Sequence, residues 1–511
     1  MRRFVPTTVA GMAMLALSMS ACTSTGGGAA SGEDSASGAG SSKTLTLGMT
    51  ADIQGWDPSN QPGYQGWAAE AVWDTLIKCD AFGKPVPAMA ESWEISDDTR
   101  SITAHLRQGM TFTDGSAADS EDVKASIEFS GSHGGAQDDY ATAVIDTPDP
   151  HTVTITWPDP QPKMAGKLCL AKVTSKELLD SGEVNNKPIG SGPYVLDSQN
   201  TTRGSVYAFT KNPDHWNADS YPYEKLLLKV YDSETAALNA LKTRQIDGTL
   251  INAQSYDEVT KSGFEVATMN GQTTRLLLTD HLGEDIPALK DIRVRQAMNM
   301  VFDKELMVKS LYSGHGKPAT QIFRPGSDAY IDDLKDPYPF NVEKAKSLMK
   351  EAGYEDGFSL KLPTMQGQNH EVLMPYITQQ LGELNISVEQ VPLSGANAIS
   401  DLLSGTYPVV LWQLGNQGNS IVDIDIIVRS EGYWNLKHQD DAFIDEQWKN
   451  IVNGDEMEKK KAQQAINEYI IEQAWFVPMV NPDGFYAHVP EVKIDSISDS
   501  EALTPKLIDF Q

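Results

Sequence analysis

The first 22 residues decide which part of this chain can fold as a domain. Arg2 and Arg3 precede an apolar stretch at 9–19, and small residues lead from there to Cys22. This order is typical of a secretory signal, and the apolar stretch is too short to span a bilayer as a permanent helix. We therefore expect residues 1–21 to be a signal peptide and the remaining body to fold outside the cytoplasm.

The residues around Cys22 resemble the lipobox of bacterial lipoproteins, in which the cysteine thiol is acylated and becomes the new N-terminus. In residues 23–43, 16 of 21 positions are Gly, Ser or Ala, a composition that buries little apolar surface. Such a tether has an r.m.s. reach of roughly 25 Å. We expect residues 22–43 to be a lipidated cysteine and a flexible tether on the extracytoplasmic face of a bacterial cell membrane. A plain signal peptide with an incidental Cys22 is the alternative.

The composition is that of a large globular protein. Of 511 residues, 40% are hydrophobic and 22% are charged, so the chain has room for two or more domains with sizeable cores. The 70 acidic and 41 basic residues give a formal net charge of -29, and loss of residues 1–21 takes it to -31. Binding to phosphate backbones needs clustered Lys and Arg, so we expect no nucleic acid partner.

The chain has three cysteines, too few for a disulfide framework, and no CxxC pair that would indicate a zinc site. In an oxidising compartment, Cys79 and Cys169 either form one long-range disulfide or remain two buried free thiols. The sequence leaves both alternatives open.

Hydrophobic periodicity predicts strands that alternate with helices. Leu226, Leu228 and Val230 alternate as in a strand, and Ser233 then suits the N-cap of a helix that follows. Similar patterns predict helices after Asp291, after Asn341 and from Leu373 to Leu384, a helix capped by Ser120, and a strand at Ile386–Val388. The sequence therefore predicts a mixed α/β protein.

Short motifs of catalytic and metal sites are absent from the sequence. There is no G-x-x-x-x-G-K-[ST], H-E-x-x-H or G-x-S-x-G element and no complete EF-hand loop. His133 has no second ligand at metal-binding spacing, and the glycines at 190–192 lack the third glycine of a dinucleotide fingerprint. We expect no catalytic residue, no metal site and no cofactor, and we expect that the protein is not an enzyme.

A 43-residue segment and several shorter motifs resemble the family-5 extracellular solute-binding proteins, the receptors of ATP-driven oligopeptide, dipeptide and nickel importers. The long segment is PAMAESWEISDDTRSITAHLRQGMTFTDGSAADSEDVKASIEF at 87–129. The shorter ones follow in the family's order: WDP at 56–58, GSGPYVL at 190–196, KNPDHWN at 211–217, LKTRQID at 241–247, DIRVRQAMNMVFDKELM at 291–307 and EKAKSLMKEAGYEDGF at 343–358.

This resemblance implies a two-lobed, hinged α/β fold of the type II periplasmic-binding-protein kind, with an extra inserted subdomain. We expect lobe I at 44–80, 190–275 and 483–511, the inserted subdomain at 81–189 and lobe II at 276–482. The lobes would close on a ligand as a monomeric body. The implied partners are a membrane permease and its ATPase subunits.

In peptide-binding relatives, a Trp followed three residues later by Asp lines the cleft, and the Asp pairs with the amino group of the peptide. The matching stretch here, LWQLGNQGNSIVDID, keeps Trp412 but has Gly415 at the Asp position. A buried ammonium group without a counter-charge costs several kcal/mol. Either Asp423 or Asp425 takes over this role, or the ligand has no amino terminus there.

Other side chains near Trp412 leave the ligand class open. Asn416, Gln417 and Asn419 with an aromatic ring suit sugar hydroxyls and an apolar sugar face. The alternative is that the ring is part of the hydrophobic core.

Two further pairs of residues each have two possible roles. Tyr64 and Trp67 lie where relatives contact the ligand and would add stacking surface there, or they would pack against the first helix. Arg293 and Arg295, near the start of a predicted helix, would clamp a ligand carboxylate, or they would be solvated or paired between the lobes.

We expect a solute receptor that most readily takes an oligopeptide, with an oligosaccharide as the alternative ligand. A receptor-like chaperone, adhesin or signalling protein is the alternative of another class.

Overall fold

The computed structural model describes the part of the chain that follows the tether: residues 43–59, 66–80, 83–132, 140–162, 164–270, 272–365, 369–394, 398–415, 419–494 and 504–511. All of these described residues belong to one compact unit. Cys22 and the signal peptide lie outside the described residues.

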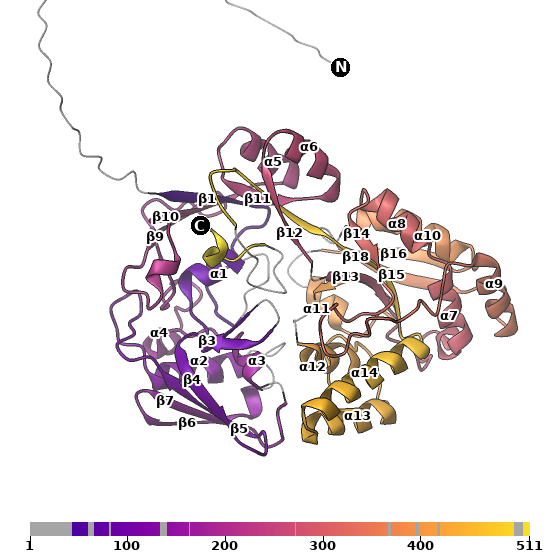
Figure 1. The fold of residues 1–511 in the computed structure, drawn as a ribbon, viewed down its shortest axis with the longest axis horizontal. Coiled ribbons are helices and arrows are strands. Elements are labelled where there is room, and N and C mark those ends of the chain that lie inside the picture. Colours follow the sequence, from indigo (N-terminus) through magenta and orange to yellow (C-terminus); the bar gives the residue numbers. More distant parts are fainter. Residues whose placement is uncertain are drawn as a thin grey trace, which may run out of the picture. The chain divides into compact units, whose positions relative to one another are not determined.

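A seven-stranded mixed sheet has the strand order β12-β19-β11-β1-β10-β9-β8 (Figure 1). Its strands are β1 Thr44–Met49, β8 Tyr194–Leu196, β9 Val206–Lys211, β10 Lys225–Val230, β11 Gly248–Ile251, β12 Glu265–Met269 and β19 Gly484–His488. Strand β1 pairs in parallel with β10 and β11, and α5 (Glu234–Lys242) makes the crossover between those two strands. Helices α1 (Gly66–Val72) and α6 (Tyr256–Lys261) also contact this sheet.

An antiparallel sheet with the order β4-β5-β7-β6 lies between β1 and β8 in the sequence. Its strands are β4 Ala90–Ile95, β5 Ser101–Leu106, β6 Val144–Asp149 and β7 Thr152–Thr156, next to the pair β2 Ile77–Cys79 and β3 Pro85–Pro87. Every second residue of β5 is buried, as expected when one face of a strand covers a core. The helices of this region are α2 Ser120–Gly131, α3 Met164–Leu168 and α4 Lys176–Ser181.

Cys79 of β2 and Cys169, which follows α3, form a disulfide with a Cα–Cα distance of 5.6 Å. The structure thus decides between the two alternatives that the sequence left open.

A four-stranded sheet with the order β14-β18-β13-β17 occupies most of the second half of the chain, beside the parallel pair β15-β16. The strands are β13 Gln272–Leu277, β14 Gly316–Pro318, β15 Ser359–Met365, β16 Ser387–Leu393, β17 Val410–Gly415 and β18 Phe476–Pro482. The helices are α7 Ile292–Met300, α8 Lys304–Leu311, α9 Val342–Glu351, α10 His370–Gly382, α11 Ala398–Leu403, α12 Ser420–Asp423, α13 Ala442–Asn453 and α14 Glu456–Glu472.

The two faces of this sheet cover two different cores. Leu276 and Leu411 belong to the core that includes α7, α8 and α10, whereas Leu277 and Trp412 belong to the core that includes α13 and α14. Alternation along β13 and β17 assigns each side chain to its face. Trp412 therefore lies on the α13–α14 side of the sheet.

The chain passes between the two large sheets at two places, from β12 to β13 and from β18 to β19. Three rings pack where the sheets are connected. Tyr256 and Phe485 belong to the first sheet region, and their ring centroids lie 4.5 and 4.9 Å from that of His315, which precedes β14.

Most of the predicted elements are confirmed. Ser233 caps α5 by accepting a hydrogen bond from the Ala236 amide at 3.2 Å. Asp291 and Asn341 likewise cap α7 and α9 through their side chains. A helix at 370–382 and a strand at 387–393 follow in the predicted order.

The cap predicted at Ser120 is wrong by one residue. Asp119 is the N-cap of α2, and its carboxylate accepts from the Glu121 amide at 2.9 Å. The Ser120 hydroxyl instead donates to the Asp149 carbonyl at 2.7 Å. Both Asp119 and Ser120 have side chains that can cap a helix. The hydrogen bond of Ser120 to the distant Asp149 carbonyl leaves the cap to Asp119.

The solvated alternative fits Arg293, whose side chain is 42% exposed, whereas neither predicted role fits Arg295. Arg293 forms an ion pair with Asp291, the N-cap of its own helix, at 2.5 Å. Arg295 is buried and donates to the carbonyls of Gln473 and Leu289 at 2.8 and 2.7 Å. Both arginines therefore fasten α7 to neighbouring backbone of the same region.

The KNPDHWN motif contributes to a buried polar cluster around Asp74. This carboxylate is fully buried and accepts from Trp216 Nε1 at 3.1 Å and from Ser191 Oγ at 3.2 Å, with His215 Nε2 at 3.3 Å. Burial alone would raise the pKa of Asp74, but the His215 hydrogen bond and the Lys78 charge outweigh it and lower the pKa. The cluster joins the start of β2 to the segment after β9.

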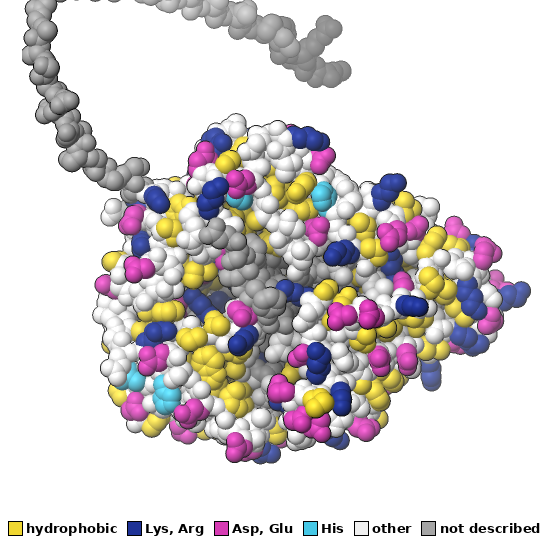
Figure 2. Space-filling view, viewed as in Figure 1, with side chains coloured by type: hydrophobic (Ala, Val, Ile, Leu, Met, Phe, Trp, Pro, Cys, Tyr) yellow, Lys and Arg dark blue, Asp and Glu magenta, His cyan; other side chains and the backbone are white. Residues whose placement is uncertain are grey.

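In the described part of the chain, no helix is both long and apolar enough to cross a membrane. On the face seen in Figure 2, basic and acidic side chains are interspersed and form no continuous stripe of one sign.

Candidate functional site

The predicted ligand residues of the second half of the chain lie at the end of β17 and in the helix that follows. We call Trp412, Gly415, Asn419 and Asp423 the 412–423 residues. Residues 416–418, which include Asn416 and Gln417, lie outside the described residues.

Trp412 is 7% exposed and is largely a core residue. Its ring lies 5.3 Å from that of Trp434 and 6.3 Å from that of His370, measured between centroids. Arg275 on β13 is its direct cross-strand partner. Both roles predicted for Trp412, core and ligand wall, remain compatible with a ring that is buried on most of its surface.

Gly415 ends β17 opposite Gln272. A Cβ atom built on Gly415 would meet no heavy atom of the described residues within 4 Å. Because a side chain would fit there, steric crowding does not explain why this chain lacks an aspartate at that position.

Asn419 is the N-cap of α12, where its side-chain oxygen accepts from the Ile421 amide at 3.0 Å. Only four residues of α-helix follow, and a π-helix at Ile424–Val428 continues them. A helix this short has little stability of its own, and its position therefore depends on tertiary contacts.

Buried amides of α14 provide those contacts. Ser420 Oγ donates to Gln463 Oε1 at 2.6 Å and accepts from the Ala329 amide at 3.1 Å. Asn467 Nδ2 donates to the Ala329 carbonyl at 2.9 Å and to Gln321 Oε1 at 2.6 Å. Ser420, Gln463 and Asn467 are all at most 3% exposed, so the network fixes the start of α12 against α14.

Asp423 is 1% exposed, at the end of α12. Its negative charge acts on Arg275, whose side chain is fully buried. Burial lowers the pKa of Arg275 to about 10, and the negative charge of Asp423 opposes this shift. The sequence reasoning missed Arg275; a lone arginine in the apolar strand TTRLLL was the available signal.

Asp425 forms an ion pair with Arg429 at 2.6 Å, and the Arg429 guanidinium lies over the Trp448 ring at 4.3 Å. Asp425, the second candidate partner for a ligand amino group, is therefore already paired with an arginine of the protein.

Trp67 packs the first helix, which is one of the two roles that the sequence left open. It is 4% exposed, its indole donates to the Pro505 carbonyl at 2.7 Å, and its ring meets that of Tyr486 edge-on at 5.7 Å. This burial fits the packing role, and the ligand contact of Trp67 stays a prediction. Tyr64 lies outside the described residues.

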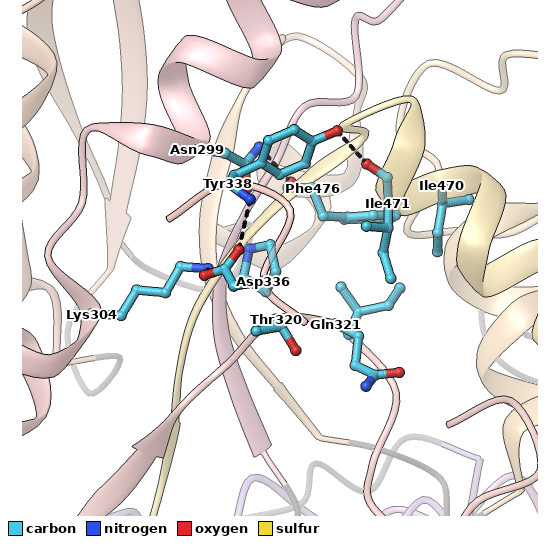
Figure 3. A pocket seen from close by; sticks show the side chains of 11 residues that line it. Asn299, Lys304, Thr320, Gln321, Asp336, Tyr338, Ile470, Ile471 and Phe476 are labelled. Atoms are coloured by element: carbon cyan, nitrogen blue, oxygen red, sulfur yellow. Dashed lines mark hydrogen bonds and ion pairs between the residues drawn. The ribbon is translucent and has the colours of Figure 1, made fainter. Parts of the chain in front are cut away.

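A small interior cavity lies away from the 412–423 residues, between α8, α14 and the segment 320–338 (Figure 3). Lys304 Nζ donates there to Asp336 and to the Ala319 carbonyl at 3.0 and 2.9 Å, and Tyr338 donates to the Ile471 carbonyl at 2.8 Å. Its volume of about 10 Å³ is about that of one water molecule, and ligand pockets are usually ~300–1,000 Å³. We therefore regard it as a packing feature that anchors the segment 320–338.

Within the described ranges, no cluster of three or more His, Cys, Asp or Glu side chains is arranged to hold a metal ion.

Residues 84–422 match the family described as bacterial extracellular solute-binding proteins, family 5. The glutathione-binding protein GsiB of Salmonella paratyphi A is 27% identical over 331 residues, which are 62% of this chain and 63% of that protein. The curated relatives are matched over 56% to 66% of their own length.

Two solved structures share the fold. AgaA of A. tumefaciens R10, in complex with agropinic acid, has a TM-score of 0.80 at 23% identity over 92% of this chain and 98% of its own. DppA of Helicobacter pylori, in complex with the peptide STSA, has a TM-score of 0.78 at 20% identity over 91% and 97%. At these identities the likeness shows the fold, a type II periplasmic-binding-protein arrangement of α/β sheets.

Proposed function

The chain belongs to family 5 of the bacterial extracellular solute-binding proteins, and from this premise we propose that it captures an oligopeptide and delivers it to an ATP-driven membrane importer. The observation that carries the proposal is the family match over residues 84–422. A peptide-bound relative of the same fold supports the choice of ligand. The importer's permease and ATPase subunits are the proposed partners.

We infer a two-lobed receptor in which ligand binding selects a closed arrangement. The seven-stranded sheet would form lobe I, the antiparallel sheet the inserted subdomain, and the β13–β18 region lobe II. Because β13 begins at Gln272 within the second sheet, we place the lobe boundary close to residue 271 and not at 275.

An oligosaccharide is the second candidate ligand, and one observation favours it. Gly415 stands where a peptide receptor would carry an acid, so an uncharged polar ligand needs no counter-charge from this position. The exposed part of the Trp412 ring would contact the apolar face of a sugar.

We also propose that acylated Cys22 anchors the receptor at the outer face of the cell membrane, through the Gly, Ser and Ala tether. The protein would act by binding and release alone, without covalent chemistry on the ligand.

Ligand binding is tested with the purified protein, a pool of di- to pentapeptides and a pool of oligosaccharides. A ligand at 100 times its Kd raises the free energy of unfolding by about 2.7 kcal/mol, so the active pool should raise Tm. Small-angle scattering should show a smaller radius of gyration with that pool. Response to oligosaccharides alone would favour the second candidate, response to neither pool would contradict both, and hydrolysis of pool members would favour an enzyme.

A further inference from the structure

We propose that helices α3 and α12 form a latch, a close approach of the inserted subdomain to the β13–β18 region that stabilises the closed arrangement of the receptor. Gly166 of α3 and Val422 of α12 face each other in this latch. Its role in ligand capture rests on the proposed function, whereas the approach of the two helices does not.

One face of α3 belongs to the core of the inserted subdomain, and Gly166 lies on another face. Met164, Ala165 and Leu168 are buried in that core, as expected for residues three and four apart on a helix. A Cβ atom built on Gly166 would have one heavy atom of the described residues within 4 Å, Val422 Cγ2 at 3.8 Å. This is an ordinary van der Waals distance, so the gap between the two helices has the size of one methyl group.

Both helices are fixed in place by their own surroundings. The Tyr140 hydroxyl donates to the Lys167 carbonyl at 2.8 Å, and Cys169, directly after α3, is bonded to Cys79 of β2. On the other side, the buried Ser420 hydroxyl ties the first turn of α12 to α14. Neither helix can shift far without loss of a covalent or buried bond, so the gap between them depends on how the two parts of the molecule approach each other.

The latch lies away from the connections between the two large sheets. Near those connections, His315 packs on Tyr256 and Phe485, and Gln254 Nε2 donates to the Leu311 carbonyl at 3.1 Å. Figure 1 shows α3 and α12 away from α6 and β14, the elements beside this ring cluster. A rotation about the connections would therefore separate α3 from α12 more than it separates the rings. The latch would form only in a closed arrangement and would add to the preference for it.

The latch also gives a reason for a glycine within α3. Glycine forms helices less readily than alanine, because it loses more backbone freedom on folding. Without a side chain, however, Gly166 lets α12 approach closely, and any side chain larger than a methyl group would meet Val422. Position 166 thus sets how closely the two parts can come together.

The approach of the helices is tested without a ligand by an engineered disulfide, Gly166→Cys with Val422→Cys. The Cβ position of residue 166 lies 3.8 Å from Val422 Cγ2, and a carbon–carbon bond is about 1.5 Å, so the two Cβ atoms lie within about 5.3 Å of each other. Disulfides join Cβ atoms that are ~3.5–4.5 Å apart, so at most a small movement is needed. After oxidation, mass spectrometry of an unreduced digest should find the 166–422 link in most molecules that keep the native 79–169 link.

Glu177→Cys with Val422→Cys is the matched control. Glu177 is an exposed residue of α4, a helix of the same subdomain that packs against α2, and Figure 1 shows α4 farther from α12 than α3 is. This pair should link at least about tenfold less often, because its Cβ atoms are out of reach. Equal linking in the two variants would overturn the latch, and so would the absence of a 166–422 link.

The effect on ligand capture is tested with a tryptic digest as the probe, followed by calorimetry with the peptide that the wild type retains best. Gly166→Ala fills the gap with one methyl group and should bind this peptide at least as tightly as the wild type. Gly166→Phe overpacks the gap and should raise Kd roughly 5- to 150-fold. Addition of Val422→Ala to Gly166→Phe makes room for the ring and should recover most of that loss.

An unchanged Kd in Gly166→Phe, or weaker binding by Gly166→Ala, would overturn the role of the latch. A loss that Val422→Ala does not reduce would also overturn it, because a folding defect confined to α3 would not respond to a change at position 422. Retention of no peptide by the wild type would contradict the proposed oligopeptide ligand, and the engineered disulfide would then decide on the latch alone.

Discussion

At the scale of the residue, Trp412 contributes to the core more than to any surface. Its ring packs against Trp434 and His370, and its exposure is 7%. A substitution that removes the whole ring therefore changes the free energy of unfolding as well as any contact with a ligand.

Trp412→Ala should lower the free energy of unfolding by about 3–5 kcal/mol, because it leaves a cavity in the core between β17 and α14. Trp412→Phe keeps most of the ring and should cost less than half as much. Urea denaturation measures both. Equal stability of the alanine variant and the wild type would contradict the core placement.

His281 provides a test of pH dependence. Its ring stacks on Trp475 at 4.2 Å, and burial, with a smaller effect from the positive charge of Arg295, lowers the pKa of His281 to about 4. The unfolded chain binds this proton near pH 6.5 and the native state does not, so stability should fall as pH decreases from about 6.5 to 4.

The size of that fall should be about 1–3 kcal/mol for this one group. His281→Phe keeps a ring on Trp475 but takes up no proton, so its stability should change less over the same range. Denaturation curves at pH 7, 6, 5 and 4 compare the two proteins, and parallel profiles would contradict the assignment.

At the scale of the element, a disulfide and a buried polar cluster join segments that flank the inserted sheet. Cys79 and Cys169 join β2 to the end of α3 across a sequence separation of 90. The Asp74 cluster adds a buried link to the segment after β9.

Replacing both cysteines by serine should lower the free energy of unfolding by about 2–4 kcal/mol, because the unfolded chain loses a long covalent loop. The wild type under reducing conditions should match this Cys79→Ser, Cys169→Ser variant. Urea midpoints with and without reductant provide the measurement; a wild type insensitive to reductant would contradict the link.

At the scale of the whole molecule, the expected attachment to the membrane depends on one atom, the sulfur of Cys22. Cys22→Ala should release the protein or leave its signal peptide uncleaved, because no thiol remains to be acylated. Cell fractionation and mass spectrometry of the mature N-terminus test this. A mature N-terminus downstream of Cys22 without lipid would contradict it.

The sequence by itself determined the order of helices and strands, because periodicity and capping act over a few residues: Ser233, Asp291 and Asn341 cap the helices predicted for them. Ordered motifs also determined the family. Only the tertiary structure decided which of Asp119 and Ser120 caps α2, that Cys79 and Cys169 pair, and that Trp67 is core.

The ligand site divides in the same way. The sequence indicated Trp412 and the missing acid at Gly415, because both lie in one short motif. A lone arginine in an apolar strand marks Arg275 in the sequence, but its place opposite Trp412 does not follow from it. Strand register brings β13 beside β17 and places Arg275 opposite Trp412, and such pairings depend on contacts between distant segments, which local patterns do not encode.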